Sequence, residues 1–196
     1  MANIAISGDT SGAITLAAPA VSGTSTLTLP SGASGTIAAQ GVSTNIVSGT
    51  AQASTSGTSI DFTGIPSWVK KITVMFSGVS TNGTSNILVQ IGSGSVTTSG
   101  YQSAIYQYSG ATASSTAGFL FTAAITAAGA HSGSMILTLL NNNLWTEMSG
   151  VAVAGNSGGT GGGTSSALGG ALDRVRVTTV NGTDTFDAGS INILYE

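Results

Sequence analysis

Residues 71–76, Lys-Ile-Thr-Val-Met-Phe, alternate with the two-residue period of a β-strand and place Ile72, Val74 and Phe76 on one face. No helical periodicity extends beyond about two turns anywhere in the chain. Further strands are expected at 86–91, 134–140, 144–153, 173–180 and 190–195, with weaker ones at 57–62, 101–107 and 117–123. Gly- and Asn-rich turns separate these runs, so residues 54–196 are predicted to form a jelly-roll-like antiparallel β-sandwich.

The composition fits a folded all-β protein with many tight turns. The 196 residues include 29 Gly, 4 Lys or Arg and 7 Asp or Glu, and there is no Cys to form a disulfide or bind zinc. A thinly spread net charge of −3 argues against nucleic acid or an anionic membrane as a partner. No apolar run is long enough to span a membrane, and the first residues lack the pattern of a secretory signal. We therefore expect neither membrane insertion nor export by that route.

Residues 1–53 differ in character from the rest of the chain. No ionisable side chain occurs between Asp9 and Asp61, and residues 1–50 hold no aromatic residue. Short alternating runs end at Gly, Pro or Ser-Gly, and two of them, ITLAAPAVSG at 14–23 and LTLPSGASG at 27–35, resemble each other. Strands this short, with one apolar face, are not stable alone.

Three outcomes are open for this segment: disorder, packing on the C-terminal region, or packing of identical copies on one another. We favour self-association, because an uncharged alternating strand is an edge that monomers normally protect with Lys or Pro. Three chains wound about a common axis would close such edges and bury their apolar side chains. The prediction is an extended fibrous β neck in a homotrimer, with axial contacts from Ile14, Leu16, Leu27, Leu29 and Ile37.

No arrangement of residues predicts catalysis, a metal site or a cofactor. The single histidine, His131, is expected in a solvent-facing turn without an orienting carboxylate. Asp184 and Asp187 could offer oxygen ligands to calcium, but a Thr-Asp turn explains them as well. Residues 157–164 lack the Lys of a phosphate loop and are expected to form a flexible loop, in which Gly161 could meet a ligand at an exposed apex.

Three tyrosines between residues 100 and 110 are candidate receptor contacts. Tyr106 and Tyr108 share one face of a predicted strand, with Gln107 opposite, and Tyr101 lies nearby in the sequence. Amphipathic rings beside amide side chains suit stacking on sugars and hydrogen bonding to them. The competing interpretation is a strand half packed into the core.

Residues 11–41 resemble the neck segments of tailed-bacteriophage fibre proteins, in which phrases such as TLxAP, TLTLP and GT recur. Residues 60–76, IDFTGIPSWVKKITVMF, and the C-terminal FDAGSINILYE resemble the C-terminal domain of phage tail-fibre and other virion proteins. The resemblance covers most of the chain. It implies a homotrimer whose N-terminal part joins other virion proteins and whose C-terminal β-domain points outward. No catalytic or ligand residue can be transferred from it.

The expected function is mechanical and adhesive rather than enzymatic. We expect a structural protein of a virion, assembled from chains made in the host cytoplasm, in which a trimeric tail or virion fibre exposes its β-domain to a host-surface glycan or protein. Several copies would let weak single contacts add up to firm attachment. Two alternatives stay open: a capsid decoration or neck fibre with a purely structural role, and a polysaccharide-degrading tailspike.

Overall fold

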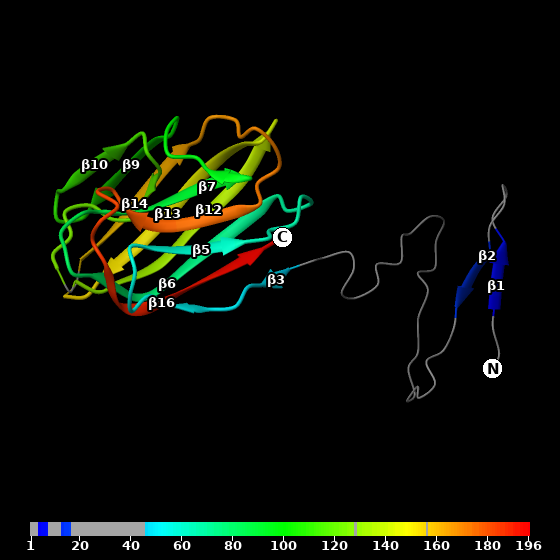
Figure 1. The fold of residues 1–196 in the computed structure, drawn as a ribbon, viewed down its shortest axis with the longest axis horizontal. Coiled ribbons are helices and arrows are strands. Elements are labelled where there is room, and N and C mark those ends of the chain that lie inside the picture. Colours follow the sequence, from blue (N-terminus) through cyan, green and yellow to red (C-terminus); the bar gives the residue numbers. More distant parts are fainter. Residues whose placement is uncertain (1–3, 8–12, 17–45, 128, 156) are drawn as a thin grey trace, which may run out of the picture. The chain divides into compact units, whose positions relative to one another are not determined.

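The computed structural model describes residues 4–7, 13–16, 46–127, 129–155 and 157–196 (Figure 1). The chain separates into two units, Met1–Gln40 and Gly41–Glu196. All elements within the described ranges are β-strands, every strand pair is antiparallel, and none of these residues is helical. The prediction of an all-β, antiparallel protein is therefore confirmed. No helix in the described part of the chain could cross a membrane.

The first unit contains a two-stranded hairpin. Strand β1 (Ile4–Ser7) pairs with β2 (Ala13–Leu16), and the register places Ile4 opposite Leu16 and Ile6 opposite Ile14. Two of the predicted axial positions therefore lie on β2. The other three, Leu27, Leu29 and Ile37, lie outside the described residues.

The second unit is built from two antiparallel sheets. The larger sheet has nine strands, in the order β10-β9-β14-β13-β12-β6-β16-β3, with β4 also paired to β16. Their bounds are Val47–Ser48 (β3), Gln52–Ala53 (β4), Lys71–Thr81 (β6), Gln102–Gln107 (β9), Thr112–Ser115 (β10), His131–Asn141 (β12), Leu144–Val153 (β13), Ser157–Thr164 (β14) and Phe186–Tyr195 (β16). The smaller sheet has the order β11-β7-β15-β5, with β8 also paired to β7. Its bounds are Ser59–Thr63 (β5), Ile87–Ser93 (β7), Ser95–Val96 (β8), Phe119–Leu120 (β11) and Arg174–Thr179 (β15).

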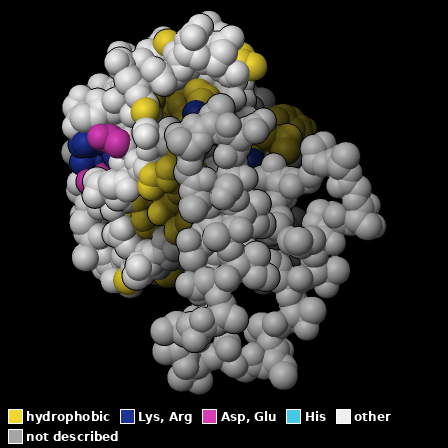
Figure 2. Space-filling model, turned by 90° about the vertical axis from the view of Figure 1, so that its right-hand side faces the viewer, with side chains coloured by type: hydrophobic (Ala, Val, Ile, Leu, Met, Phe, Trp, Pro, Cys, Tyr) yellow, Lys and Arg dark blue, Asp and Glu magenta, His cyan; other side chains and the backbone are white. Residues whose placement is uncertain are grey.

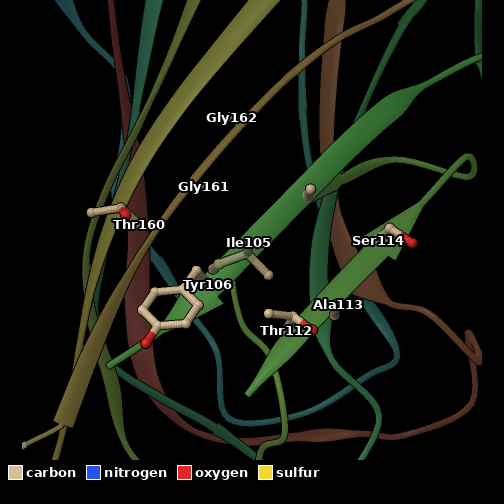
Figure 3. Close-up of a pocket in the computed structure, with 9 residues that line it drawn as sticks. Ile105, Tyr106, Thr112, Ala113, Ser114, Thr160, Gly161 and Gly162 are labelled. Carbon is tan, nitrogen blue, oxygen red and sulfur yellow. The ribbon is translucent and has the colours of Figure 1, made fainter. Parts of the chain in front are cut away.

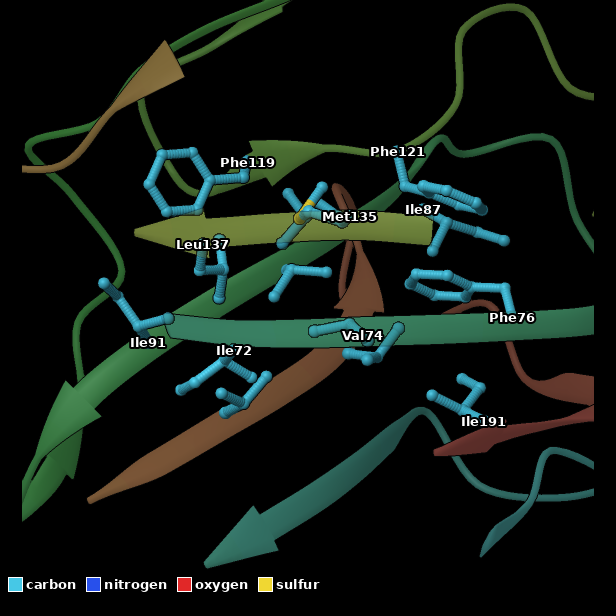
Figure 4. Close-up of a cluster of buried hydrophobic side chains, with 14 of the residues drawn as sticks. Ile72, Val74, Phe76, Ile87, Ile91, Phe119, Phe121, Met135, Leu137 and Ile191 are labelled. Atoms are coloured by element: carbon cyan, nitrogen blue, oxygen red, sulfur yellow. The ribbon is translucent and has the colours of Figure 1, made fainter. Parts of the chain in front are cut away.

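The hydrophobic core is formed by inward side chains of both sheets (Figure 4). Ile72, Val74 and Phe76 of β6 are buried, as their alternation predicts. Phe76 stacks on Phe121, which follows β11, with 3.8 Å between the ring centroids. From the smaller sheet, the buried valines of β15 belong to the same core. Burying this much apolar surface between two layers is the main source of the domain's stability.

Residues 157–164 form a strand, which corrects the prediction of a flexible loop. This strand, β14, lies inside the larger sheet and pairs along its length with β13 on one side and β9 on the other. Glycine has no side chain to reveal alternation, so the strand has no period-two signal in the sequence. Its neighbours hold it in place through backbone hydrogen bonds.

The sandwich also begins earlier than the predicted boundary between residues 53 and 54. Strands β3 and β4 both pair with β16, and the amide of Gly49 donates a 2.8 Å hydrogen bond to the carbonyl oxygen of Ile193. Residues 47–53 therefore form part of the edge of the larger sheet. The sequence places these residues in the predicted neck because, like the rest of that segment, they have a low charge and no aromatic side chain.

Candidate binding face

The outer face of the larger sheet carries a hollow where β9, β10 and β14 meet. β9 alternates strictly, and its outward residues are Gln102, Ala104 and Tyr106. The side chains of Ile105 and Gln107 point inward and are buried. Because β9 pairs with β10 on one side and β14 on the other, its outward residues form the middle of three cross-strand rows.

The register defines the members of these rows. The first row consists of Thr112, Tyr106 and Thr160. The second row consists of Ser114, Ala104 and Gly162. The third includes Gln102 and Thr164. Rows on one face of a strand are about 7 Å apart, and neighbouring strands are about 4.8 Å apart.

Small residues in the second row leave a depression between the two bulkier rows, which we call the outer groove (Figure 3). Two adjoining hollows of about 510 and 580 Å³ share Ser114, Ala104 and Gly162 as their floor. Figure 3 shows the Tyr106 ring at one end of the first hollow, with Thr160 and Thr112 on the strands to either side. Hollows of this size match those of small-molecule sites, although this one is open to solvent.

Gly162 has no internal reason to be glycine. A Cβ atom built on it would meet only the carbonyl oxygen of Glu147, at an ordinary 3.6 Å, and its φ angle lies outside the left-handed region. Gly150 on β13 is similar, with no heavy atom within 4 Å of a Cβ. By contrast, a Cβ on Gly163 would approach the carbonyl oxygen of Gln102 to 2.4 Å. Gly162 therefore keeps the floor low rather than relieving a clash.

The strands of the outer groove carry no charged residue. β9, β10 and β14 contain neither acidic nor basic side chains, and Glu147 on the adjacent β13 is buried on the inward side. Charge gathers instead on the smaller sheet, where Asp61 accepts hydrogen bonds of 2.7 and 2.8 Å from Arg176. The face of the domain visible in Figure 2 is likewise mostly uncharged. The outer groove therefore differs in chemistry from the outer face of the smaller sheet.

Tyr106 on β9 and Tyr108 in the turn that follows it lie on the outer surface. Their side chains are 49% and 66% exposed, and their ring centroids are 6.5 Å apart. A Cβ on Gly158 would lie 3.4 Å from the Tyr108 ring, so the missing side chain lets this ring approach β14 closely. The two rings form an amphipathic edge beside the outer groove.

Tyr101 is not a surface residue, which corrects its assignment as a receptor contact. Its side chain is 1% exposed and packs edge-on against Phe119, with 4.9 Å between ring centroids. Its hydroxyl accepts a hydrogen bond from the amide of Ile91 and donates to the carbonyl oxygen of Thr97. Burial raises the pKa of Tyr101 to about 12. Gly161 lies on β14 and lines the outer groove rather than a loop apex.

His131 is buried, which corrects the prediction of a solvent-facing turn. It is the first residue of β12, 1% exposed, and pairs with Val79 of β6 and Val153 of β13. Its Nδ1 lies 3.3 Å from the carbonyl oxygen of Val79. Burial lowers the pKa of His131, so its neutral form is favoured. The turn-forming sequence around it does not reveal that a long strand begins there.

The candidate calcium residues take part in turn contacts. Asp184 accepts hydrogen bonds from Nδ2 of Asn181 and from the amide of Ser85, at 2.6 and 2.9 Å, and these contacts, that of Asn181 most strongly, lower its pKa. Asp187 accepts a hydrogen bond from the hydroxyl of Ser80. Within the described ranges, no three metal-ligating side chains of the His, Cys, Asp or Glu type come together.

Sequence reasoning identified Tyr106, Tyr108 and Gly161 but missed the rest of the outer groove. Thr112, Ser114 and Thr160 join it only through strand pairing, and residues far apart in the sequence cannot be placed side by side from periodicity alone. No family model, no curated protein and no solved structure matches this chain.

Proposed function

We propose that this protein is a non-enzymatic structural component of a bacteriophage virion, a trimeric tail or virion fibre that presents its β-sandwich to the host surface. The observation that carries this proposal is the exposed Tyr106–Tyr108 pair beside an uncharged, hydroxyl-lined groove. Exposed aromatic side chains in such a setting favour contact with a partner over solvation. The resemblance of residues 11–41 and 60–76 to phage fibre segments supplies the biological setting.

The topology of the sandwich supports a jelly roll, the fold expected from the sequence. The jelly-roll order is reproduced in both sheets when the sandwich is read as eight successive units. These units are β5, β6, β7, β9, β10, β11, the three-stranded meander β12–β13–β14, and β15. The meander takes the place of a single strand, and its odd number of strands preserves the chain direction. β16 and the short β3 and β4 then extend the sheet beyond β6.

The placement of the carboxylates supports a binding role over a hydrolytic one. Glycosidases need two carboxyl groups that face a substrate. Asp61 and Asp173 are each paired with an arginine, and Glu196 is paired with Lys71. None of these residues lines the outer groove.

The trimer is part of the proposal, and the β1–β2 hairpin supports it. A two-stranded hairpin is only marginally stable in water, and the pairing of Ile4 with Leu16 and Ile6 with Ile14 brings four apolar positions together. Further copies of the chain would complete such a unit. In this proposal the neck joins other virion proteins, and three sandwiches act together on one surface.

The test is binding of the purified full chain to cells of the bacterium that the phage infects, measured by fluorescence of labelled protein. Replacing both rings, Tyr106→Ala with Tyr108→Ala, is expected to weaken binding at least about tenfold, a loss of about 1.4 kcal/mol. The matched control is Trp68→Ala, which removes a 41% exposed aromatic side chain that contacts Tyr195 instead of the tyrosine pair.

Each alternative has its own outcome in this experiment. A full chain that binds no cells, and whose tyrosine pair is covered by neighbouring proteins in the particle, would be a capsid decoration or neck fibre. A full chain that shortens the host polysaccharide would be a tailspike. Either result overturns the proposed function.

A further inference from the structure

We propose that the outer groove is a binding site for an uncharged saccharide, with Tyr106 as its stacking platform and Thr112, Ser114 and Thr160 as its hydroxyl partners. This inference rests on the proposed function and deepens it by naming the ligand class and the side chains that recognise it.

The first step is the aromatic platform. The Tyr106 ring is 49% exposed, and the register places a threonine on each side of it. The C–H-rich face of a pyranose ring packs well on such a ring, whose own hydroxyl stays in water. Because Tyr106 lies in a strand that is paired on both sides, its backbone is held by the sheet rather than by a mobile loop.

The second step is the floor. Between the Tyr106 row and the Gln102 row, about 13 Å apart along β9, only Ser114, Ala104 and Gly162 occupy the face. Three strands give this floor a length of about 10 Å. On the adjacent β13, Met148 pairs with Gly162 and is 65% exposed. A ring-shaped ligand can therefore lie flat on the floor against the tyrosine.

The third step is the glycine itself. Glycine weakens a strand interior by about 0.5–1 kcal/mol relative to alanine, and it often marks a place where a ligand or another backbone approaches closely. Neither backbone conformation nor packing requires glycine at position 162. A ligand that lies on the floor would occupy the space that a side chain at position 162 would fill.

The fourth step is charge and hydrogen bonding. The three strands of the outer groove offer hydroxyl groups and the amide of Gln102, and none of them carries a charge. Each hydroxyl can both donate and accept a hydrogen bond, which matches the hydroxyls of a neutral sugar. A carboxylate or ammonium group would lose water here without gaining an opposite charge. The groove therefore fits neutral sugars better than acidic or basic ones.

The experiment is saturation-transfer NMR on the full chain, with glucose, galactose, mannose, rhamnose and N-acetylglucosamine as neutral probes and glucuronic acid and glucosamine as charged ones. At least one neutral sugar is expected to receive saturation with a Kd on the order of 1–10 mM, and the charged sugars are not. Gly162→Val, which fills the floor, is expected to weaken that signal at least about tenfold while the thermal midpoint stays equal or rises.

The matched control is Gly169→Val, the same substitution at an exposed glycine that lies outside the outer groove and has no heavy atom within 4 Å of a Cβ. It is expected to leave the sugar signal unchanged. The proposal is overturned if no neutral sugar receives saturation, if Gly162→Val binds as the wild type does, or if Gly162→Val changes the oligomeric state, because the glycine would then serve contact between copies. Cell binding that persists when all sugars fail would overturn this inference and leave the proposed function standing.

Discussion

Glu147 is an acidic residue in an interior position of the sandwich. It shares the inward side of β13 with Trp145 and Ser149 and is 6% exposed. It forms no ion pair within the described residues. Burial raises the pKa of Glu147 from an ordinary 4.5 to about 7. The folded state therefore holds this proton more tightly than the unfolded state does.

The stability of the domain is expected to depend on pH through this residue. The pKa of Glu147 is higher in the folded state than in the unfolded state. The contribution of its bound proton to the stability of the fold is therefore complete below about pH 4.5 and is lost as the pH rises to about 7. At about 1.4 kcal/mol per pH unit, the loss is about 3 kcal/mol. Glu147→Gln is expected to remove this dependence and to be more stable than the wild type at pH 8, as measured by urea unfolding across the pH range. A wild-type stability that stays flat between pH 5 and 7 would contradict this.

Single residues were predictable where a side chain's own pattern decides its place. The inward positions of β6 follow from alternation, and so does the shared outer face of Tyr106 and Tyr108. Tyr101 and His131 were misplaced because Tyr101 lies immediately before β9 and His131 begins β12, and both are beside turn-forming residues. Tyr101 is buried against β7, which lies ten residues earlier at Ile91, and His131 is buried against β6, which lies 52 residues earlier at Val79.

At the scale of the element, β14 shows how glycine can serve two opposite purposes in adjacent positions. Gly163 is required by packing, because a Cβ there would lie 2.4 Å from the carbonyl oxygen of Gln102 and 2.9 Å from the Cα of Ser103. Gly162, the next residue, has room for a side chain on the outer face. A backbone atom cannot yield as a flexible side chain can, so the two positions should respond differently to the same change.

Gly163→Ala is expected to destabilise the domain by about 2 kcal/mol, in the range of strained core substitutions, whereas Gly162→Ala is expected to be neutral or slightly stabilising. The measurement is thermal unfolding of both variants by circular dichroism. For a domain of this size, about 2 kcal/mol lowers the midpoint by about 4–8 °C. Equal midpoints for the two variants would show that the strand relaxes away from the contact.

Most strands were predictable from the sequence, because their side chains alternate. The predicted runs 71–76, 144–153 and 190–195 lie within β6, β13 and β16. The strand that completes the outer groove was not predictable, since five of the eight residues of β14 are glycine. The position of β14 is fixed by hydrogen bonds to the backbone groups of β9 and β13, because buried backbone groups need hydrogen-bond partners on both sides of a strand.

At the scale of the whole molecule, the order of the strands lay beyond the sequence. Each sheet joins strands from both halves of the chain, as when β16 pairs with β6 and β15 with β5. Periodicity shows which face of a strand is buried but not which strand lies beside it. The uncharged outer groove and the ion pairs of the smaller sheet could be located only after the sheets were assembled.

The two units lead to a prediction about truncation. Deleting residues 1–40 removes the first unit and keeps β3 and β4 on β16. We expect the remaining chain to unfold at the midpoint of the full chain and to be monomeric, because the proposed trimer contacts lie in the deleted part. Light scattering coupled to sizing gives the oligomeric state, and calorimetry gives the midpoint.

Deleting residues 1–53 also removes β3, β4 and the hydrogen bond between Gly49 and Ile193, which exposes the edge of β16. The edge residue Ile193 is only 3% exposed in the intact sheet, so this longer deletion is expected to lower the midpoint by several degrees and to promote aggregation through the open edge. Comparing the two deletions separates assembly from folding: the first should change the oligomer alone, and only the second should change the stability of the sandwich. A full chain that is already a monomer would contradict the proposed trimer, whereas equal midpoints for the two deletions would show that β3 and β4 add nothing to the sheet.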